Sequence, residues 1–297
     1  MGTTVLERPP RLGPLYRAAA LRRSTGTTLP ERGLRLDGVR VDLAHLAEYD
    51  RVCGFRLGDE LPATYPHVLA FPLAMALMTA SDFPFPLLGL VHVRNRVEML
   101  RPLRSSDTFS LSARAEALRP HERGTQLDVV ATAAIDGEVV WTGRSTYLRK
   151  TSKSSKSEKS KESEKSDKSQ AFEAPNATWR VPRRTGNDYA RVSGDRNPIH
   201  TSRLLARAFG FRATIAHGMW MKARCLAALE GRLPDAYAVE VAFKLPVLLP
   251  ATVGFSASPG GTGWRFAVHD RRTGRPHLAG AIVDHDCADP DAGGAAG

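Results

Sequence analysis

The stretch SGDRNPIH, residues 193–200, places a carboxylate, an amide and an imidazole within a few positions of one another. Asn197 before Pro198 predicts a helix start, because asparagine caps free N–H groups and proline suits the first helical position. Asp195 is then expected in the preceding loop and His200 in the first helical turn. A carboxylate and a neutral imidazole that face one cleft can deprotonate water and return the proton. A plain helix cap accounts for the same residues, so this stretch alone does not establish a catalytic site.

The location of these two groups at a helix N-terminus also predicts their charge. The positive potential there opposes a positive charge on His200 and favours its neutral form. Asp195 is expected to stay ionised beside the free N–H groups of the same terminus. The pair would therefore be able to accept a proton at neutral pH.

A second short stretch, IAHGM at 215–219, stands immediately before an apolar run with helical periodicity. Gly218 would leave a backbone N–H accessible at the helix start, and such a donor can stabilise negative charge that develops on an oxygen. The structural alternative is that Gly218 allows close packing and that His217 is a hydrogen-bonded core histidine. Both interpretations stay open at this point.

The elements that would position these residues follow one pattern in both halves of the chain. An apolar run with helical periodicity, over 66–80 and again over 217–232, precedes four segments of strand character. A shorter helix is expected over 198–210, after the cap. Asp136-Gly137 predicts a tight hairpin between two strands of the first half. The strands are expected over 89–100, 108–118, 126–135 and 138–148, then over 238–245, 252–258, 264–270 and 277–284.

Matching positions in the two halves indicate an internal duplication. The same shift in numbering carries Pro102 onto Pro246 and Thr108 onto Thr252. Each copy would be an α+β unit in which an antiparallel sheet covers one long helix. Two copies could pair their edge strands into one continuous sheet, which would protect both edges.

Residues 151–170 separate the two copies and contain only Ser, Lys, Glu, Asp, Thr and Gln. No side chain of this set can enter a core, so a flexible, solvated linker is expected. The predicted organisation is a first domain over 1–150, the linker over 151–170, and a second domain over 171–297.

The chain is basic, with 42 Lys and Arg against 31 Asp and Glu and a formal net charge of +11. A basic surface attracts nucleic acids, anionic lipids, phosphorylated cofactors or acidic carrier proteins. The sequence has no zinc-finger, RNA-recognition or basic-zipper pattern, so no nucleic acid partner is expected. It has no apolar window of about 18 residues, so no membrane insertion is expected. The 3 cysteines lie far apart in the sequence, which argues against a zinc site or disulfides and favours a cytoplasmic location.

The segment YARVSGDRNPIHTSRLLARAFGFRATIAHGM, residues 189–219, resembles the signature of the MaoC-like hydratases, also called (R)-specific enoyl-CoA hydratases or hydratase 2. The resemblance implies a hot-dog fold, here doubled, and the reversible hydration of trans-2-enoyl thioesters to (3R)-hydroxyacyl thioesters. It also implies that Asp195 and His200 are catalytic, that the Gly218 N–H binds the thioester oxygen, and that Asn197 holds the loop in shape. The first half lacks the motif, which implies one active site per chain and a first half that shapes the acyl pocket.

The resemblance further implies the kind of substrate and partner. No metal and no redox cofactor are expected, and the acyl group would be carried on coenzyme A or on an acyl carrier protein. Lys244, Arg203, Arg207 and Lys222 are candidates for contact with the phosphates of such a carrier, because arginine and lysine pair well with phosphate. A (3R)-hydroxyacyl-carrier-protein dehydratase and a non-catalytic acyl-thioester-binding protein are the alternatives. The chain could be a monomeric pseudo-dimer or form a homodimer.

Overall fold

The computed structural model of the protein describes residues 2–21, 28–150 and 175–284. The linker predicted over 151–170 and the third cysteine, Cys287, lie outside the described residues. Within the described ranges, none of the helices is both long enough and apolar enough to cross a bilayer.

Each half contains several helices and a set of strands that is antiparallel except for the parallel pair β1 and β2 in the first half. The first half consists of β1 (Thr3–Leu6), α1 (Leu12–Leu21), β2 (Gly33–Arg40), α2 (Leu43–Cys53), α3 (Tyr65–Thr79), β3 (Leu90–Met99), β4 (Thr108–His121), β5 (Gly124–Ile135) and β6 (Glu138–Lys150). The second half consists of β7 (Ala177–Val181), α5 (Thr185–Ser193), α6 (Pro198–Thr201), α7 (Arg203–Ala208), α8 (Gly218–Ala228), β8 (Tyr237–Phe243), β9 (Ala251–Gly260), β10 (Gly263–Asp270) and β11 (Pro276–Asp284).

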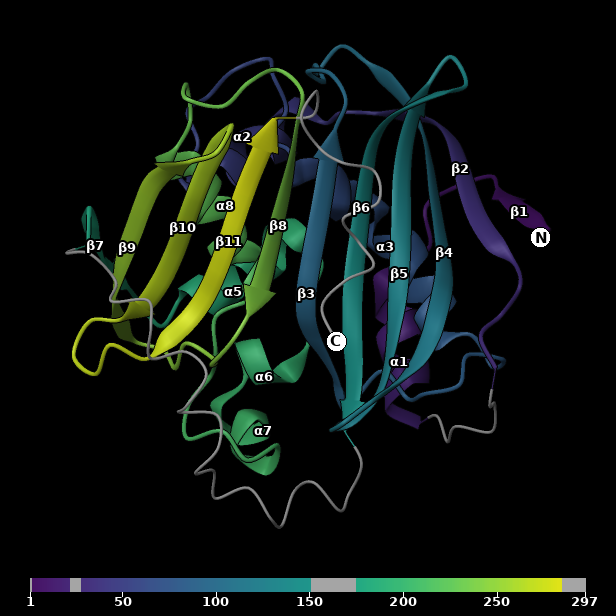
Figure 1. The fold of residues 1–297 in the computed structure, drawn as a ribbon. Helices are drawn as coiled ribbons and strands as arrows, with labels where there is room; N and C mark the ends of the chain where they lie inside the picture. Colours follow the sequence, from purple (N-terminus) through teal and green to yellow (C-terminus); the bar gives the residue numbers. More distant parts are fainter. Residues whose placement is uncertain (1, 22–27, 151–174, 285–297) are drawn as a thin grey trace.

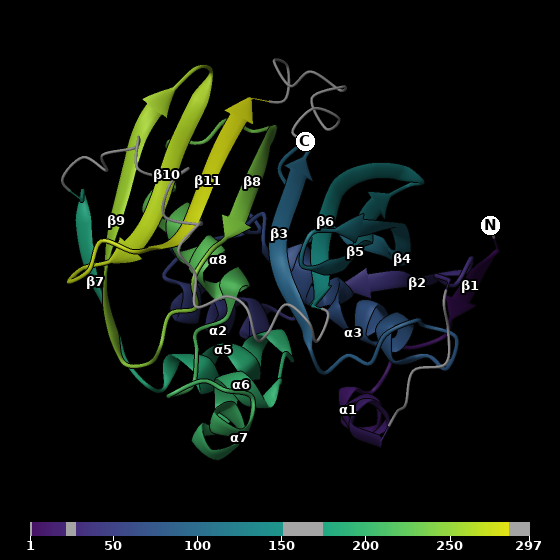
Figure 2. The ribbon, with the colours of Figure 1, turned by 60° about the horizontal axis from the view of Figure 1, so that its bottom comes forward.

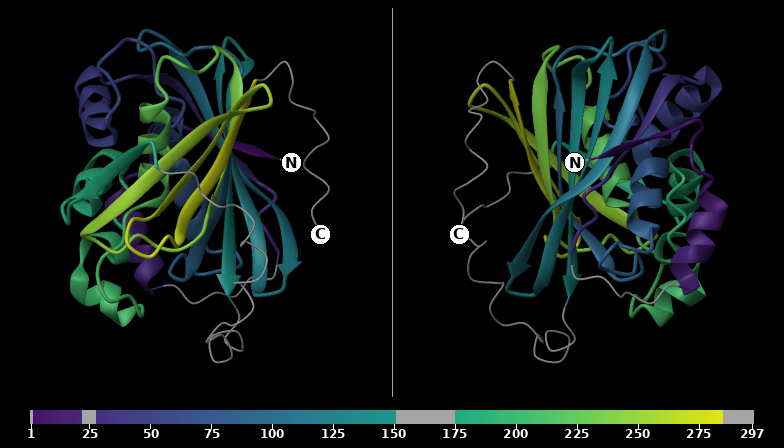
Figure 3. Two further views of the ribbon diagram at one scale, coloured as in Figure 1. Left: turned by 60° about the vertical axis from the view of Figure 1, so that its left-hand side comes forward. Right: turned by 90° about the vertical axis from the view of Figure 1, so that its right-hand side faces the viewer.

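The strands of the described residues join one 11-stranded sheet in the order β1-β2-β4-β5-β6-β3-β8-β11-β10-β9-β7. The two halves meet where β3 pairs antiparallel with β8, in a register that sets Asn95 opposite Val241. The edge-strand pairing expected between the two copies is therefore confirmed. Figures 1 and 3 show the helices gathered on one face of the sheet, with α3 behind the strands of the first half and α8 behind those of the second. The chain has the α+β double hot-dog fold predicted from its sequence.

The long helices and the hairpin form for the reasons that the sequence supplies. The apolar run over 66–80 is α3, and most of its side chains are buried. The run over 217–232 is α8, which begins at Gly218 and ends at Ala228. Asp136 and Gly137 have φ of 50° and 85°, as the predicted tight hairpin requires.

The prediction of a single helix over 198–210 was wrong, because the chain forms two shorter helices there. Ser202 interrupts the run with extended angles, φ −126° and ψ 117°, between α6 and α7. Its hydroxyl accepts the Leu205 N–H at 3.4 Å and so caps α7. Serine is favoured at a helix N-cap over a helix interior, because its hydroxyl accepts a free backbone N–H there.

Candidate active site

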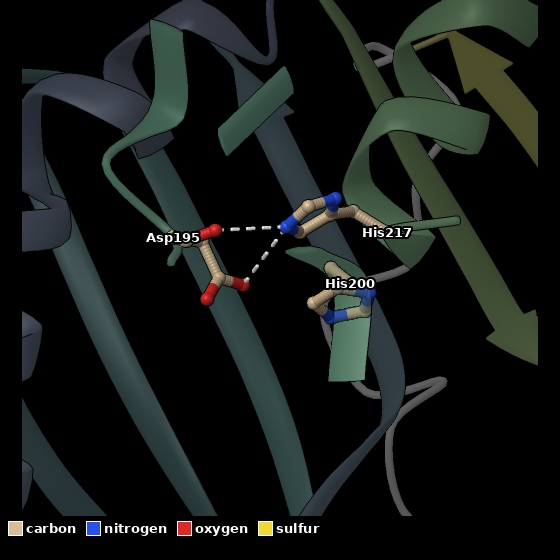
Figure 4. A group of neighbouring side chains, drawn as sticks. All are labelled: Asp195, His200 and His217. Carbon is tan, nitrogen blue, oxygen red and sulfur yellow. Dashed lines mark hydrogen bonds and ion pairs between the residues drawn. The ribbon is translucent and has the colours of Figure 1, made fainter. Parts of the chain in front are cut away.

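Three ionisable side chains of the second half converge beside the start of α8. Asp195 lies in the loop between α5 and α6, His200 in α6, and His217 at the N-cap of α8. One nitrogen or oxygen atom from each lies within 4.8 Å of the other two. Figure 4 shows the three side chains grouped together. The structure thus brings the predicted Asp195 and His200 together, and it adds His217 to them.

The loop that carries Asp195 is held by its own backbone and side chains. Gly194 ends α5 in the left-handed conformation, with φ of 73°, which a glycine adopts without strain. The Asp195 N–H donates to the Ser193 hydroxyl at 3.2 Å. Asn197 caps α6 as predicted, since its side chain accepts the Ile199 N–H at 3.4 Å, and its own N–H donates to Asp195 Oδ1 at 3.1 Å. These bonds aim the carboxylate at the two imidazoles.

His200 is held in a single tautomer. Its Nδ1 lies 2.8 Å from the Ile215 carbonyl oxygen, which can only accept, so Nδ1 carries the proton and Nε2 keeps a lone pair. Ile215 in turn donates its N–H to the Ile199 carbonyl at 3.1 Å, so two hydrogen bonds join α6 to the segment before α8. Burial lowers the pKa of His200 below its ordinary value, although the Asp195 charge opposes this shift. The neutral form of His200 is thus favoured, as predicted. The cause is burial, and not the positive potential at the start of a four-residue helix.

His217 stacks against the ring of His200 and hydrogen-bonds to the backbone of Asp195. The two rings stack with centroids 3.6 Å apart and planes 25° apart. The His217 Nε2 donates to the Asp195 carbonyl oxygen at 2.9 Å and lies 3.8 Å from Asp195 Oδ2. Burial, with His200 beside it, lowers the pKa of His217 to about 3, so the ring is neutral and only 2% exposed. These contacts agree with the interpretation of His217 as a hydrogen-bonded core histidine. It is buried within the candidate site.

Asp195 is ionised in this setting. Burial alone would raise its pKa, but His217, His200 and the hydrogen bonds from the Asn197 N–H and the Tyr16 hydroxyl outweigh burial and hold the pKa below its ordinary value. An anionic carboxylate therefore faces a neutral imidazole that has a free lone pair. This is the arrangement of a proton acceptor pair.

Gly218 occupies the first position of α8, where a backbone N–H has no partner inside the helix. A Cβ built on Gly218 would lie 2.8 Å from the Phe243 ring, so glycine is needed for this close approach. The close-packing interpretation of Gly218 is thus supported, while the binding of an oxygen by its N–H stays a prediction.

Tyr16 is a site residue that the sequence analysis missed. It comes from α1 in the other half, and its hydroxyl donates to the Gly194 carbonyl at 3.1 Å with Asp195 Oδ1 at 3.4 Å. The Arg196 N–H donates to the same hydroxyl oxygen at 2.8 Å. Burial and the Asp195 charge raise the pKa of Tyr16, so it stays a neutral donor. No local pattern around residue 16 signals this role, because only the packing of α1 against the second half creates it.

The four residues proposed to meet carrier phosphates are not equivalent. Arg203 is exposed and lines a surface pocket together with His200 and Arg183. Arg207 and Lys244 are also exposed, but they do not line that pocket.

The prediction that Lys222 contacts a carrier phosphate was wrong. Its side chain is fully buried, with Nζ 2.6 Å from Asn95 Oδ1 and 3.0 Å from the Val239 carbonyl oxygen. Its position on the inner face of α8 keeps the ammonium away from solvent, so it cannot meet a carrier phosphate.

The same cluster of Asp195, His200 and His217 has the residue types of a metal site. The hydrogen bonds argue against three ligands, because the His217 nitrogen that faces Asp195 carries a proton for the Asp195 carbonyl. His200 Nε2 and the carboxylate supply two ligands, one fewer than zinc usually takes from a protein. The donor set fits proton transfer better than metal binding.

Comparisons with known proteins identify the relatives of this chain. Residues 158–280 match the family model described as MaoC like domain. The chain is 38% identical over 254 residues to 3-hydroxyacyl-thioester dehydratase X of Mycobacterium tuberculosis, across 86% of this chain and 90% of that protein.

Solved structures resemble the whole double fold. The crystal structure of HtdX from Mycobacterium tuberculosis has a TM-score of 0.75 and 36% identity, and the match covers 85% of this chain and 100% of that chain. A MaoC-like dehydratase from Phytophthora capsici shares the fold at 17% identity, with a TM-score of 0.66 over 86% of this chain and 95% of that chain. Because a relative at 38% identity aligns with 86% of the sequence and both halves superpose on such structures, the chain belongs to the family of MaoC-like dehydratases.

Proposed function

We propose that the protein adds water reversibly across the double bond of trans-2-enoyl thioesters to give (3R)-hydroxyacyl thioesters. The observation that carries the proposal is that the Asp195 carboxylate and His200, whose Nε2 keeps a lone pair, converge beside the start of α8. A protein that only bound an acyl thioester would have no need to bury two ionisable groups together, because burying each of them costs free energy. The similarity to a relative named as a 3-hydroxyacyl-thioester dehydratase supports the same reaction.

In the proposed reaction, the thioester oxygen accepts a hydrogen bond from the Gly218 N–H, which makes C3 electrophilic. Water attacks C3 and gives one proton to His200 Nε2, while Asp195 accepts a hydrogen bond from the other hydrogen. The C3–O bond forms as the C2=C3 π bond breaks, and the electron pair moves toward the thioester oxygen. C2 then takes the proton back from the dyad. One water molecule is consumed, and both side chains return to their starting states.

The remaining protein groups keep this arrangement in place. Tyr16 and the Asn197 N–H satisfy Asp195 Oδ1, so Oδ2 is the oxygen left for the water. His217 donates a hydrogen bond to the Asp195 carbonyl oxygen, and its ring stacks against the ring of His200. The scheme needs neither a metal nor a redox cofactor.

The test is hydration of a short trans-2-enoyl-CoA by the wild type and by Asp195→Asn and His200→Gln. Each substitution removes a proton acceptor with little change in volume, so kcat should fall by about 10²–10⁴-fold. Asp235→Asn, an exposed carboxylate outside the site, is the matched control and should keep the wild-type rate. Wild-type rates in both dyad variants would refute the residue assignment, and no hydration of any enoyl thioester by the wild type would refute the function.

A second candidate, dehydration of (3R)-hydroxyacyl groups held on an acyl carrier protein, is favoured by the surface of α7. This helix projects from the body of the molecule in Figures 1 and 2. Leu204 is 77% exposed and Leu205 44% exposed, between the exposed Arg203 and Arg207. Exposed leucines flanked by arginines fit an acidic, partly apolar protein surface better than a small nucleotide. Since Arg203 also lines the pocket at His200, a carrier seated on α7 would be close to the dyad.

The carrier is identified by comparing kcat/KM for one enoyl group on coenzyme A and on an acyl carrier protein. Leu204→Ser should reduce kcat/KM several-fold for the carrier-bound substrate and leave the coenzyme A substrate unaffected. Leu57→Ser, at an equally exposed leucine after α2, is the control. An equal response of both substrates to Leu204→Ser would favour coenzyme A. We also propose a reducing, cytoplasmic location, which the free, buried thiols of Cys53 and Cys225 support.

A further inference from the structure

The C-terminal end of α5 leads directly into the loop that carries Asp195. The last carbonyl groups of a helix have no partner inside it, so other groups must satisfy them. Here two side chains of the first half do so. The Tyr16 hydroxyl donates to the Gly194 carbonyl at 3.1 Å, and His45 Nε2 lies 2.8 Å from the Val192 carbonyl oxygen. Val192 is only 2% exposed, so water is not an alternative partner for its carbonyl.

His45 is itself fixed by its own helix and by α3. It lies in the first turn of α2, where the Asp42 carboxylate accepts the His45 N–H at 3.2 Å and the Ala44 N–H at 2.9 Å and so caps the helix. The His45 Nδ1 lies 2.8 Å from the hydroxyl oxygen of Tyr65, the fully buried first residue of α3. Both ring nitrogens therefore have partners, which hold the ring in one orientation.

The direction of the two bonds to the His45 ring follows from their ends. A carbonyl oxygen can only accept, so His45 Nε2 carries a proton and donates it to Val192. With one proton on the ring, Nδ1 keeps a lone pair and accepts the Tyr65 hydroxyl hydrogen. A chain of hydrogen bonds thus runs from the start of α3 through α2 to the end of α5. It joins the long helix of the first half to the loop of Asp195.

A second contact between α2 and α5 is of a different kind. The two helices pack together, and at the surface Arg191 pairs with Glu48 at 2.6 Å, with the Arg191 side chain 55% exposed. Exposed ion pairs of this kind contribute little, whereas a buried carbonyl that loses its donor is costly. The bond from His45 to Val192 is therefore the contact that should matter for the loop.

We propose that His45 is a positioning residue for the hydration reaction, because its bond to the Val192 carbonyl fixes the end of α5 and with it the Asp195 carboxylate. The inference rests on the proposed function, since it assumes that Asp195 handles the water. His45 acts through Val192 and not on the substrate, so its loss should slow the chemical step more than it weakens substrate binding. The first half thereby takes part in catalysis in addition to forming the acyl pocket that the resemblance implies.

The kinetic test uses three substitutions of His45 with a short trans-2-enoyl-CoA. His45→Phe removes both bonds of the ring, and His45→Asn is too short to reach Val192 but can still accept from Tyr65. Both should lower kcat by about tenfold with a smaller change in KM. His45→Gln places an amide donor near the position of Nε2 and should recover part of the loss. Glu48→Gln, which removes the exposed ion pair between the same two helices, is the matched control and should keep the wild-type kcat.

Hydrogen–deuterium exchange gives a measurement that needs no turnover. The Asp195 and Asn197 amides are bonded inside the loop, to the Ser193 hydroxyl at 3.2 Å and to Asp195 Oδ1 at 3.1 Å. In His45→Phe and His45→Asn, peptides over 193–200 should exchange several-fold faster than in the wild type. Peptides over 264–284, from β10 and β11, should keep their rates, because a local effect differs in this way from general destabilisation.

The outcomes separate this inference from the proposed function. Wild-type kcat and wild-type exchange over 193–200 in both His45→Phe and His45→Asn would overturn the inference. An equal loss of kcat in Glu48→Gln would also overturn it, because helix packing in general would then be responsible, as would His45→Gln that is no faster than His45→Phe. If the wild type hydrates no enoyl thioester, the proposed function fails, and exchange over 193–200 still decides whether His45 fixes the loop.

Discussion

Hydrogen-bond direction distinguishes the two stacked imidazoles of the site. His200 donates from Nδ1 to the Ile215 carbonyl, whereas His217 donates from Nε2 to the Asp195 carbonyl. His200 therefore keeps its lone pair on Nε2, while the His217 nitrogen nearest the carboxylate is already occupied. One ring can accept a proton from water, and the other is a fixed support.

The pH dependence of kcat/KM should follow from the lowered pKa of His200. Its neutral form is the active one, and burial holds its pKa below 6.5. Activity should therefore persist as the pH falls through 6.5, the ordinary value for histidine, and decline only below it. Asp195, whose pKa lies below 3.8, stays ionised across this range. Rates measured between about pH 8 and about pH 4.5 check the expectation, and an acid limb centred above the ordinary histidine pKa would contradict it.

Tyr16 should act as a positioning residue. Tyr16→Phe removes the donor to Gly194 and Asp195 and the acceptor for the Arg196 N–H. We expect kcat to fall by about tenfold with a smaller change in KM, because the loop is less well fixed. The pKa of Asp195 should rise, since a hydrogen bond to its charged form is lost.

A fall in kcat with little change in KM, in a variant that melts near the wild-type temperature, would distinguish this effect from simple destabilisation. Tyr49→Phe, which removes a buried hydroxyl bonded to Thr64 at 2.7 Å, is the comparison and should leave kcat unchanged. If Tyr16→Phe alters the melting temperature but not kcat, then Tyr16 has only a structural role.

At the scale of elements, the contact of α5 with α6 sets the position of His200. A Cβ on Gly186 in α5 would collide with the His200 carbonyl oxygen, so glycine lets the two helices cross closely. The segment around Ile215 holds α6 from the other side. The four residues of α6 are too few to form a stable helix alone, and these neighbours keep it in place.

Gly186→Ala should therefore lower activity by moving α6. The added methyl group must displace backbone, which typically costs about 1–3 kcal/mol of stability in a packed site. We expect a loss of kcat larger than this destabilisation explains at assay temperatures where the variant remains folded. Gly13→Ala in α1, where a Cβ meets nothing within 4 Å, is the control. Wild-type kcat in Gly186→Ala would mean that α6 tolerates displacement.

Much of this element pattern was predictable. Apolar periodicity located α3 and α8, and alternation located the strands, because both elements bury one face against the other. Asn197 and Pro198 also marked the start of α6 correctly. The break at Ser202 was not predictable, because the local preference for a cap competes with helix continuation and tertiary packing decides between them.

At the scale of the molecule, Lys222 joins the two halves. From α8 it reaches Asn95 on β3 and Val239 on β8, the two strands that pair across the boundary. A buried lysine that donates to both strands favours this register over a shifted one, because a shift would leave its protons unpaired. Through Asn95 the same network of hydrogen bonds extends to Ser145 on β6, in the first half.

Stability should decrease as the solution is acidified below the ordinary pKa of histidine. The pKa values of His67, His92 and His217 are about 4, 3 and 3 in the folded state, against 6.5 for an ordinary histidine. The unfolded chain therefore binds more protons below pH 6.5, and the free energy of unfolding falls as the pH drops from 6.5 toward these lowered values. Melting temperatures from pH 7 to about pH 4.5 test this.

His92→Phe should flatten the dependence, since it removes one group that takes up a proton on unfolding. Phe109→Leu, at a buried aromatic ring that does not titrate, is the comparison and should leave the slope unchanged. A melting temperature independent of pH over this range would show that the three rings take up protons as readily in the folded protein as in the unfolded chain.

Residue order along the chain was sufficient to recognise the double fold and the pair of Asp195 and His200. Both depend on short-range patterns, namely periodicity, caps and a motif contained in 31 residues from 189 to 219. The contributions of Tyr16 and of His217 as a support depended on the packed structure, as did the burial of Lys222. Each of these involves partners that are distant in the sequence, such as Tyr16 and Asp195, 179 residues apart. Side-chain burial and hydrogen-bond direction arise only when two halves pack together, and no local pattern encodes them.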